Sequence, residues 1–213
     1  MLAPHATVAL GLLARRCGKP EIRAQVQLLV MRELTDFTGV DLAGALPLDA
    51  FEYDVVLLLD VLEELQDPER LLLEMRNRSR ALRPGSEAPL VLVATPNVAF
   101  LTNRLALLFG RFNYTDRGIL DIEHKRLFNR VALRRMLRDC GYSIEEILPV
   151  PVPWNAVIGG RLGRWLEWGS VLLARIWPSA FAFQFLATCR PLPGVEQVLG
   201  AREQLGPDRV EFA

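Results

Sequence analysis

Acidic and amide side chains recur where predicted strands end, and one polar loop carries a histidine. Asp41, the run Asp60–Glu64 and the pair Pro96-Asn97 each follow an apolar segment. The loop Arg111–Arg126 contains His124. Ligands of open α/β sheets bind outside the carboxyl ends of the strands, so we expect these side chains to share one site. Carboxylates suit a cationic ligand, and a histidine with a pKa near its ordinary value of ~6.5 suits proton transfer.

Each of these residues also has a plainer interpretation. Asp60 would simply cap the turn into the next helix. Glu63 and Glu64 would be solvated charges at a helix start, and Asp41 an ordinary loop acid. His124 would be a surface or structural histidine. Composition and spacing leave both sets of interpretations open.

A metal centre and a cysteine nucleophile are not favoured. Asp121, Glu123 and His124 lie within four residues of one another, but no distant ligand accompanies them. Cys17 has basic neighbours that would lower its pKa, yet no His/Asn pair supports it as a nucleophile. The three cysteines are far apart, which is typical of semi-buried side chains in a reducing compartment: Cys17, Cys140 and Cys189.

Composition indicates one globular domain with a substantial core. The 213 residues are 51% hydrophobic and 23% charged, with a formal net charge of zero. A neutral chain argues against a general nucleic-acid binder. No basic leader precedes the apolar start, and the apolar stretch Trp165–Cys189 is interrupted by Glu167, Arg175 and Pro178. We therefore expect no transmembrane segment and a cytoplasmic location.

The elements predicted to hold the candidate site alternate between strands and helices. Helical spacing favours helices over 3–16 and 20–34. Continuous apolarity predicts buried strands over 53–59 and 90–95. A helix follows Asp67-Pro68, because Asp67 can cap it and proline fits its first turn. Helices over 99–109, 130–140 and 157–175 and strands over 142–148 and 181–189 are also predicted, with a loop over 110–128.

Four blocks carry a family resemblance. DVVLLLDVLEEL followed by DP, then LRPG, then VATPN resembles the fourth-strand to fifth-strand motifs of class I S-adenosylmethionine-dependent methyltransferases. The block GRFNYTDRGILDIEHKRLF resembles GRFxYxxxGILDxxHxRFF of a bacterial subgroup often encoded beside glycosyltransferases of surface-glycan synthesis. SAFAFQFLATCRP resembles the last sheet strand of that subgroup. The resemblance covers roughly residues 38–190.

The resemblance implies a Rossmann-like α/β fold with a mainly parallel sheet, and S-adenosylmethionine as cofactor. It implies methyl transfer to an oxygen or nitrogen of a small-molecule or surface-glycan-related acceptor. Asp41 matches the acid near the adenine, and Asp60, Val61 and Leu62 match the segment beside the methionine part. The catalytic side of the site would hold three residues: Glu64, His124 and Arg126.

Two departures from the family pattern bear on activity. The family usually has His where this chain has Glu64. The glycines before Val55 form no GxGxG loop, and residues 1–37 are expected to be helical, so the amino-terminal part that holds the cofactor would be missing or diverged. The alternative function is therefore a non-catalytic methyltransferase-like remnant that acts as an interaction module. A protein partner or a homodimer would fit either function, and residues 191–213 would form a flexible tail.

Overall fold

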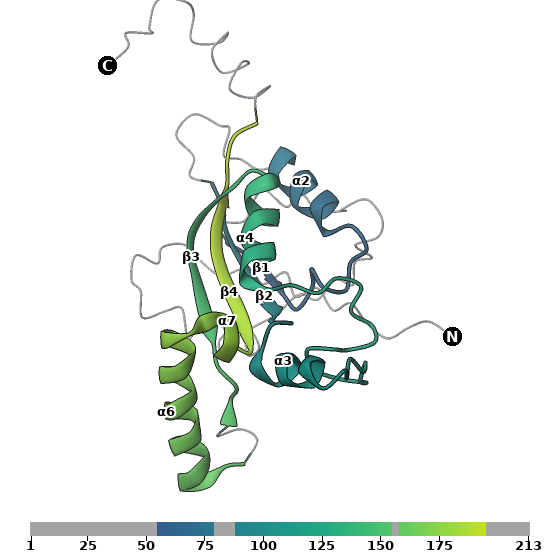
Figure 1. The fold of residues 1–213 in the computed structure, drawn as a ribbon. Helices are drawn as coiled ribbons and strands as arrows, with labels where there is room; N and C mark the ends of the chain where they lie inside the picture. Colours follow the sequence, from purple (N-terminus) through teal and green to yellow (C-terminus); the bar gives the residue numbers. More distant parts are fainter. Residues whose placement is uncertain (1–54, 79–87, 155–157, 195–213) are drawn as a thin grey trace, which may run out of the picture.

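The described part of the chain forms a four-stranded sheet with helices around it (Figure 1). The computed structural model describes residues 55–78, 88–154 and 158–194. Asp41, Cys17, the helices predicted over 3–16 and 20–34, and the tail beyond 194 lie outside these ranges.

The sheet has the strand order β1-β2-β4-β3. β1 (Val55–Leu59) pairs in parallel with β2 (Leu90–Pro96), so that Val56 lies opposite Val91. β4 (Gln184–Pro191) is antiparallel to β2 and to β3 (Tyr142–Val150). β1, β2 and β3 therefore run in one direction and only β4 is reversed. The predicted α/β class is confirmed, and the described sheet is mixed, with one parallel pairing.

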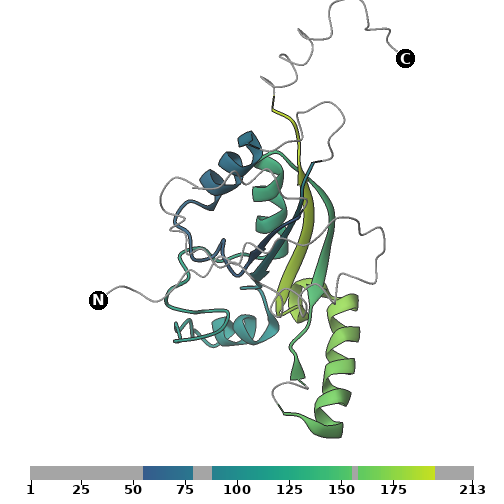
Figure 2. The same cartoon turned by 180° about the vertical axis from the view of Figure 1, so that it is seen from behind.

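One face of the sheet is covered by α2 (Pro68–Arg78) and α4 (Arg130–Asp139), which lie beside each other in two opposite views (Figures 1 and 2). Their buried side chains meet alternate strand residues in one core cluster, which includes Leu72 and Leu137 from the helices and Val56 and Val93 from the strands. Leu57 and Leu92 belong to a second cluster, because successive strand side chains point to opposite faces.

Both helix starts predicted from capping residues are confirmed. The Asp67 Oδ1 atom accepts a hydrogen bond from the Arg70 amide at 3.0 Å. The Asn129 side chain accepts bonds from the amides of Val131 and Ala132, both at 2.9 Å. Each cap satisfies amides that have no partner within the helix, and so fixes where the chain turns onto the sheet.

The structure confirms the helix predicted after β2 and corrects the start of the last strand. α3 (Leu101–Leu108) forms as expected; none of its residues is buried, and Leu108 is 76% exposed. The strand predicted over 181–189 begins at Gln184, because Pro178–Phe181 form the short helix α7. Pro178 suits the first turn of a helix, which explains the later start.

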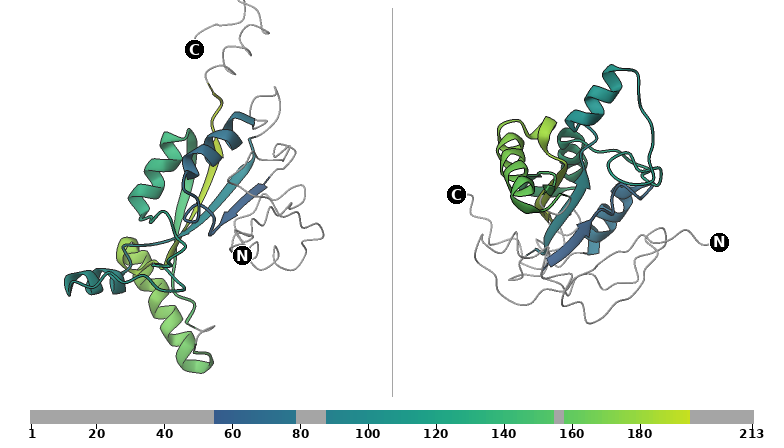
Figure 3. Two further views of the ribbon diagram at one scale, coloured as in Figure 1. Left: turned by 90° about the vertical axis from the view of Figure 1, so that its right-hand side faces the viewer. Right: turned by 90° about the horizontal axis from the view of Figure 1, so that it is seen from below.

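The long helix α6 (Gly160–Ile176) follows β3 and lies beyond the end of the sheet (Figure 3). α3 lies beyond the same end, where β1, β2 and β3 have their carboxyl termini (Figures 1 and 3). The candidate site residues come from this end.

Candidate functional site

Asp60 ends β1 in a left-handed backbone conformation, with φ of 54°. Aspartate tolerates this conformation better than most residues, and such outliers concentrate at functional sites. The Asp60 amide donates to the carbonyl of Ala94 at 3.1 Å, and the Gln184 Nε2 atom donates to Asp60 Oδ1 at 2.9 Å. The cap of α2 is Asp67, so the capping interpretation of Asp60 is wrong for that helix.

The Asp60 carboxyl group faces solvent at the edge of the sheet but has dense protein around it. This partial burial raises its pKa from the ordinary value, whereas the neighbouring Glu63 side chain and, to a smaller extent, a positive charge on His124 lower it. Asp60 is therefore within electrostatic reach of the histidine that the sequence placed in the same site.

Glu63 is buried, with 1% of its surface exposed, so its interpretation as a solvated charge is wrong. The pKa of its carboxyl group is raised to about 8, chiefly by burial and to a smaller extent by the charges of Asp60 and Glu64, whereas its own main-chain amide lowers it. The Thr95 hydroxyl lowers this pKa to a smaller extent, although no hydrogen bond of normal geometry joins the two groups. Within the described residues, neither Glu63 carboxyl oxygen has a hydrogen-bond partner, and neither does Thr95 Oγ1.

The main chain of Glu63 fixes the loop that carries His124. Its carbonyl oxygen accepts hydrogen bonds from the amides of Lys125 at 2.7 Å and Arg126 at 3.0 Å. These bonds tie the loop to the turn that follows β1, although more than 60 residues of sequence lie between them. His124 is thereby held beside the carboxyl groups of Asp60 and Glu64.

The His124 ring is partly buried, and its Nδ1 atom lies 3.2 Å from the carbonyl oxygen of Ile119. A carbonyl only accepts hydrogen bonds, so Nδ1 must carry the proton in this contact. In the neutral ring Nε2 then keeps its lone pair and can accept a proton.

Glu64 completes this group of side chains. It is partly buried, which raises the pKa of its carboxyl group, whereas the positive charge of His124 lowers it. The nearby acids Glu123, Asp60 and Asp121 raise it again. The structure thus brings together four of the side chains that the sequence placed at this end of the sheet: Asp60, Glu63, Glu64 and His124.

The other predicted site residues lie elsewhere. The Arg126 guanidinium contacts both oxygens of Glu69 on α2, at 2.5 and 2.6 Å, and is engaged there rather than with the carboxyl cluster. Val61 and Leu62 are buried in the core, so only their main chain is available to a ligand. Asp41 is outside the described residues.

Asn97 has a structural role at the end of β2. Its Nδ2 atom donates to the carbonyls of Ala182 at 2.8 Å and Ser179 at 3.2 Å, and its Oδ1 atom accepts from the Ala99 amide at 3.1 Å. The side chain is fully buried. It therefore holds the segment before β4 against β2, and has no group free for a ligand.

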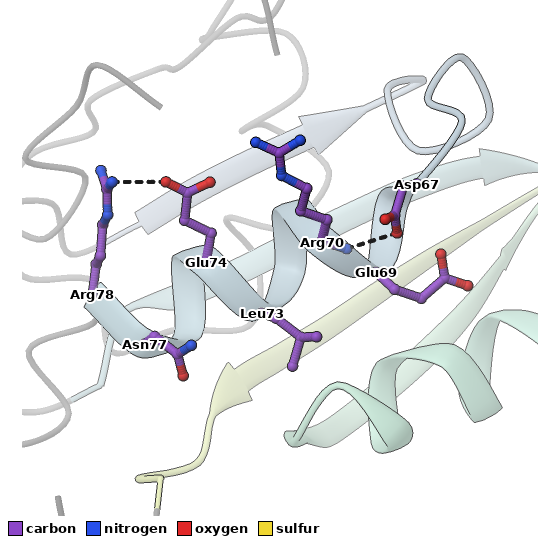
Figure 4. Close-up of a pocket in the computed structure, with 7 residues that line it drawn as sticks. All are labelled: Asp67, Glu69, Arg70, Leu73, Glu74, Asn77 and Arg78. Atoms are coloured by element: carbon purple, nitrogen blue, oxygen red, sulfur yellow. Dashed lines mark hydrogen bonds and ion pairs between the residues drawn. The ribbon is translucent and has the colours of Figure 1, made fainter. Parts of the chain in front are cut away.

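A shallow depression of about 450 Å³ lies along α2, and none of the cluster residues lines it (Figure 4). Its walls are Asp67 and side chains of that helix, mostly charged or polar but including Leu73, and an ion pair joins Glu74 to Arg78 at 2.7 Å. It contains no nucleophile or histidine, and we assign no chemistry to it.

Within the described residues, neither a group of metal ligands nor a reactive thiol stands out. No group of three or more His, Cys, Asp or Glu side chains there is placed to hold a metal ion. Cys140 and Cys189 are buried, and burial raises the thiol pKa to about 11 and about 12 respectively. Both cysteines are therefore unreactive core residues at neutral pH.

Comparison with known proteins gives distant structural similarity only. No protein-family model and no curated protein sequence matches the chain. The chain is similar to a SAM-dependent methyltransferase of Thermotoga maritima, described as a possible histamine N-methyltransferase, with 14% identity over 69% of this chain and 59% of that chain, and a TM-score of 0.41. A SAM-dependent methyltransferase of Archaeoglobus fulgidus has 17% identity over 65% and 59%, with a TM-score of 0.35.

A third similar structure is the [4+2]-cyclase SpnF, with 16% identity over 80% of this chain and 61% of that chain, and a TM-score of 0.39. The chain thus spans about three fifths of the length of each of these three proteins. Their descriptions include different activities, so the function of this chain rests on its own site residues.

The sequence did not predict Gln184 as a member of the site. Gln184 is the single polar residue in the run Ala182–Ala187, and that interruption of an apolar strand was the available signal. Glu63 was expected in the site together with Glu64, but adjacent acids before a helix do not indicate which one is buried.

Proposed function

We propose that this chain belongs to an S-adenosylmethionine-dependent methyltransferase that acts on an oxygen or nitrogen of a small-molecule acceptor. The observation that carries the proposal is the pair of carboxyl groups, Asp60 and Glu63, at the carboxyl end of β1, with His124 fixed beside them. The ordered sequence motifs around these residues resemble those of class I methyltransferases.

The carboxyl pair suits the cofactor. S-adenosylmethionine supplies a methyl group on a positively charged sulfonium. A buried carboxyl group without a hydrogen-bond partner in the described part of the chain, such as that of Glu63, is strongly stabilised by a cation. Asp60 and Glu63 would face the charged part of the cofactor, with the main chain of Val61 and Leu62 alongside and Asp41 near the adenine.

His124 would act on the acceptor. Since Nδ1 donates to Ile119, Nε2 is free to remove the proton that an attacking hydroxyl or amine loses. Methyl transfer requires the nucleophile, carbon and sulfur in line, so the hydrogen bonds that fix the loop to Glu63 would also position this base. Glu64 would replace the histidine usual at that position and orient the His124 ring by charge. Arg126 would act indirectly, by tethering the loop to α2.

The block GRFNYTDRGILDIEHKRLF, which resembles a bacterial methyltransferase subgroup, supports finer parts of the proposal. The acceptor would be related to surface glycans, and the methyltransferase-like domain would span residues 38–190. The enzyme would be cytoplasmic and would act with a protein partner or a second copy. Nucleotide sugars are suitable first acceptors to test, because they are small and rich in hydroxyl groups.

Calorimetric titration of the full chain with S-adenosylmethionine tests cofactor binding. We expect saturable binding that weakens at least tenfold in Asp60→Asn and is unchanged in Glu123→Gln, an exposed acid of the same loop. Absence of binding at millimolar cofactor would refute cofactor binding by this chain and favour the non-catalytic module.

Release of S-adenosylhomocysteine in the presence of pooled nucleotide sugars and small amines tests the catalytic step. His124→Ala should reduce turnover by about 100- to 10,000-fold, the usual contribution of a general base, and should leave cofactor affinity unchanged. Equal turnover in both proteins would remove His124 from the mechanism, whereas binding without turnover of any acceptor would support the non-catalytic alternative.

A further inference from the structure

The outward surface of α6 is apolar, the reverse of an ordinary amphipathic helix in a globular protein. Only Gly163 and Ala174 of this helix are buried. Trp165 is 72% exposed and Ile176 is 72% exposed, and the other large apolar side chains of the outward surface are also exposed: Leu162, Leu166, Trp168, Leu172 and Leu173. Small residues thus face the protein and large apolar residues face outward.

A row of cations borders this apolar surface. These cations are Arg161, Arg164 and Arg175, and the intervals of three and eleven residues place them on one flank of the helix, together with Trp168. Part of this flank lines a shallow hollow of about 650 Å³ with Trp165. Glu167, the one acid in α6, is at helical spacing with the buried Gly163 and Ala174, on the side toward the protein.

We propose that α6 binds flat on an anionic membrane surface, with its apolar side in the lipid and its arginine flank at the phosphate groups. Tryptophan favours the boundary between lipid and water, and arginine can bury its stem while its charged group reaches phosphate. A helix with these two sides matches the pattern of interfacial membrane-binding helices. No described helix is long and apolar enough to cross a bilayer, which agrees with a helix that lies in the surface plane.

The charge pattern favours lipid over a second copy of the chain. In an antiparallel pairing centred on Gly169, Arg161 and Arg164 of one helix would lie near Arg175 of the other. Like charges placed together oppose association. Each copy also contributes only one acid on α6, Glu167, against three arginines, and it lies toward the protein rather than on this flank. Anionic lipid supplies the missing negative charge.

A second apolar element lies at the same end of the molecule. α3 has no buried residue, and Leu108 and Phe109 at its carboxyl end are each 76% exposed. α3 and α6 both extend beyond the carboxyl ends of β1, β2 and β3 (Figures 1 and 3). A membrane that contacts α6 would therefore lie on the side of the molecule where Asp60 and His124 are found. The membrane proposal holds whatever reaction the site catalyses.

Co-sedimentation of the full chain with lipid vesicles tests the proposal. We expect binding to equimolar phosphatidylcholine and phosphatidylglycerol, weaker binding to phosphatidylcholine alone, and a loss of binding as salt is raised. The triple variant Arg161→Gln, Arg164→Gln, Arg175→Gln should bind the anionic vesicles roughly 100-fold more weakly, at about fivefold per arginine. Trp165→Ser combined with Trp168→Ser should also weaken binding while circular dichroism remains unchanged.

A matched control removes three exposed arginines from α4, which covers one face of the sheet and is separate from α6. The substitutions are Arg134→Gln, Arg135→Gln and Arg138→Gln. This variant should bind as the wild type does. Equal losses in both triple variants would show attraction by net charge alone and overturn the docking role of α6. A dimer in light scattering that dissociates in the Trp165/Trp168 variant, with no vesicle binding, would overturn the proposal in favour of a second copy.

Discussion

Replacing Glu63 by glutamine should change how the stability of the protein depends on pH. Burial raises the pKa of this carboxyl group from 4.5 to about 8 in the folded protein. Between these values the folded state holds a proton that the unfolded state has released. A raised carboxyl pKa therefore contributes stability that is complete below about pH 4.5 and is lost as the pH rises toward 8.

The size of the effect follows from the pKa difference. Each pH unit within this window removes about 1.4 kcal/mol of unfolding free energy per group. From pH 6 to pH 8, Glu63 should therefore reduce the stability of the wild type by roughly 2–3 kcal/mol. Glutamine has nearly the same shape and no ionisation, so Glu63→Gln should lack this part of the decline.

Urea unfolding at pH 6, 7 and 8, followed by circular dichroism, measures the difference. The variant should be the more stable protein at both ends of the range, by about 2 kcal/mol at pH 6 and by roughly 4–5 kcal/mol at pH 8. Glu123→Gln, which removes an exposed acid from the neighbouring loop, should follow the wild type. If wild type and Glu63→Gln lose equal stability between pH 6 and pH 8, the buried carboxyl group does not have the raised pKa on which the argument depends.

Two further substitutions test structural roles near the site. Asn97→Ala should lower the unfolding free energy by roughly 2–4 kcal/mol, because the Ala182 carbonyl and the Ala99 amide lose their side-chain partner. The Ser179 carbonyl keeps its bond from Arg104 at 3.2 Å. Urea unfolding measures the loss, with Asn103→Ala, which loses one bond, for comparison. Gly141→Ala should cost about 1–2 kcal/mol in the same assay, because φ of 78° disfavours a side chain there; unchanged stability would contradict the described turn.

The sequence predicted elements well where a short-range signal determines them. The caps at Asp67 and Asn129 act within three residues, so the starts of α2 and α4 could be read locally. Continuous apolarity identified β1 and β2, because both faces of these strands are covered. The direction of β4 could not be predicted, since the segment between β3 and β4 is long enough for either pairing.

Burial of individual side chains depends on distant parts of the chain and escaped prediction. Adjacent acids such as Glu63 and Glu64 look alike in sequence, but the turn after Asp60 directs one into the core and leaves the other partly exposed. The leucines of α3 have the spacing of a buried helical stripe, yet Leu101 is only half-buried, and Leu105 and Leu108 are 47% and 76% exposed. Spacing defines a face of a helix, and only the tertiary structure determines what that face contacts.

Glu63 connects the stability of the fold with the chemistry of the site. Its carbonyl oxygen holds the loop of His124, so the residue cannot move without displacing the proposed base. Its carboxyl group has no partner among the described residues and destabilises the fold as the pH rises. A residue that was present only to fix the loop would need no ionisable side chain, because the main chain makes those bonds. Under the proposed function, a methyl-donating sulfonium bound beside this carboxyl group would supply a positive charge, lower its pKa and offset the loss of stability at higher pH.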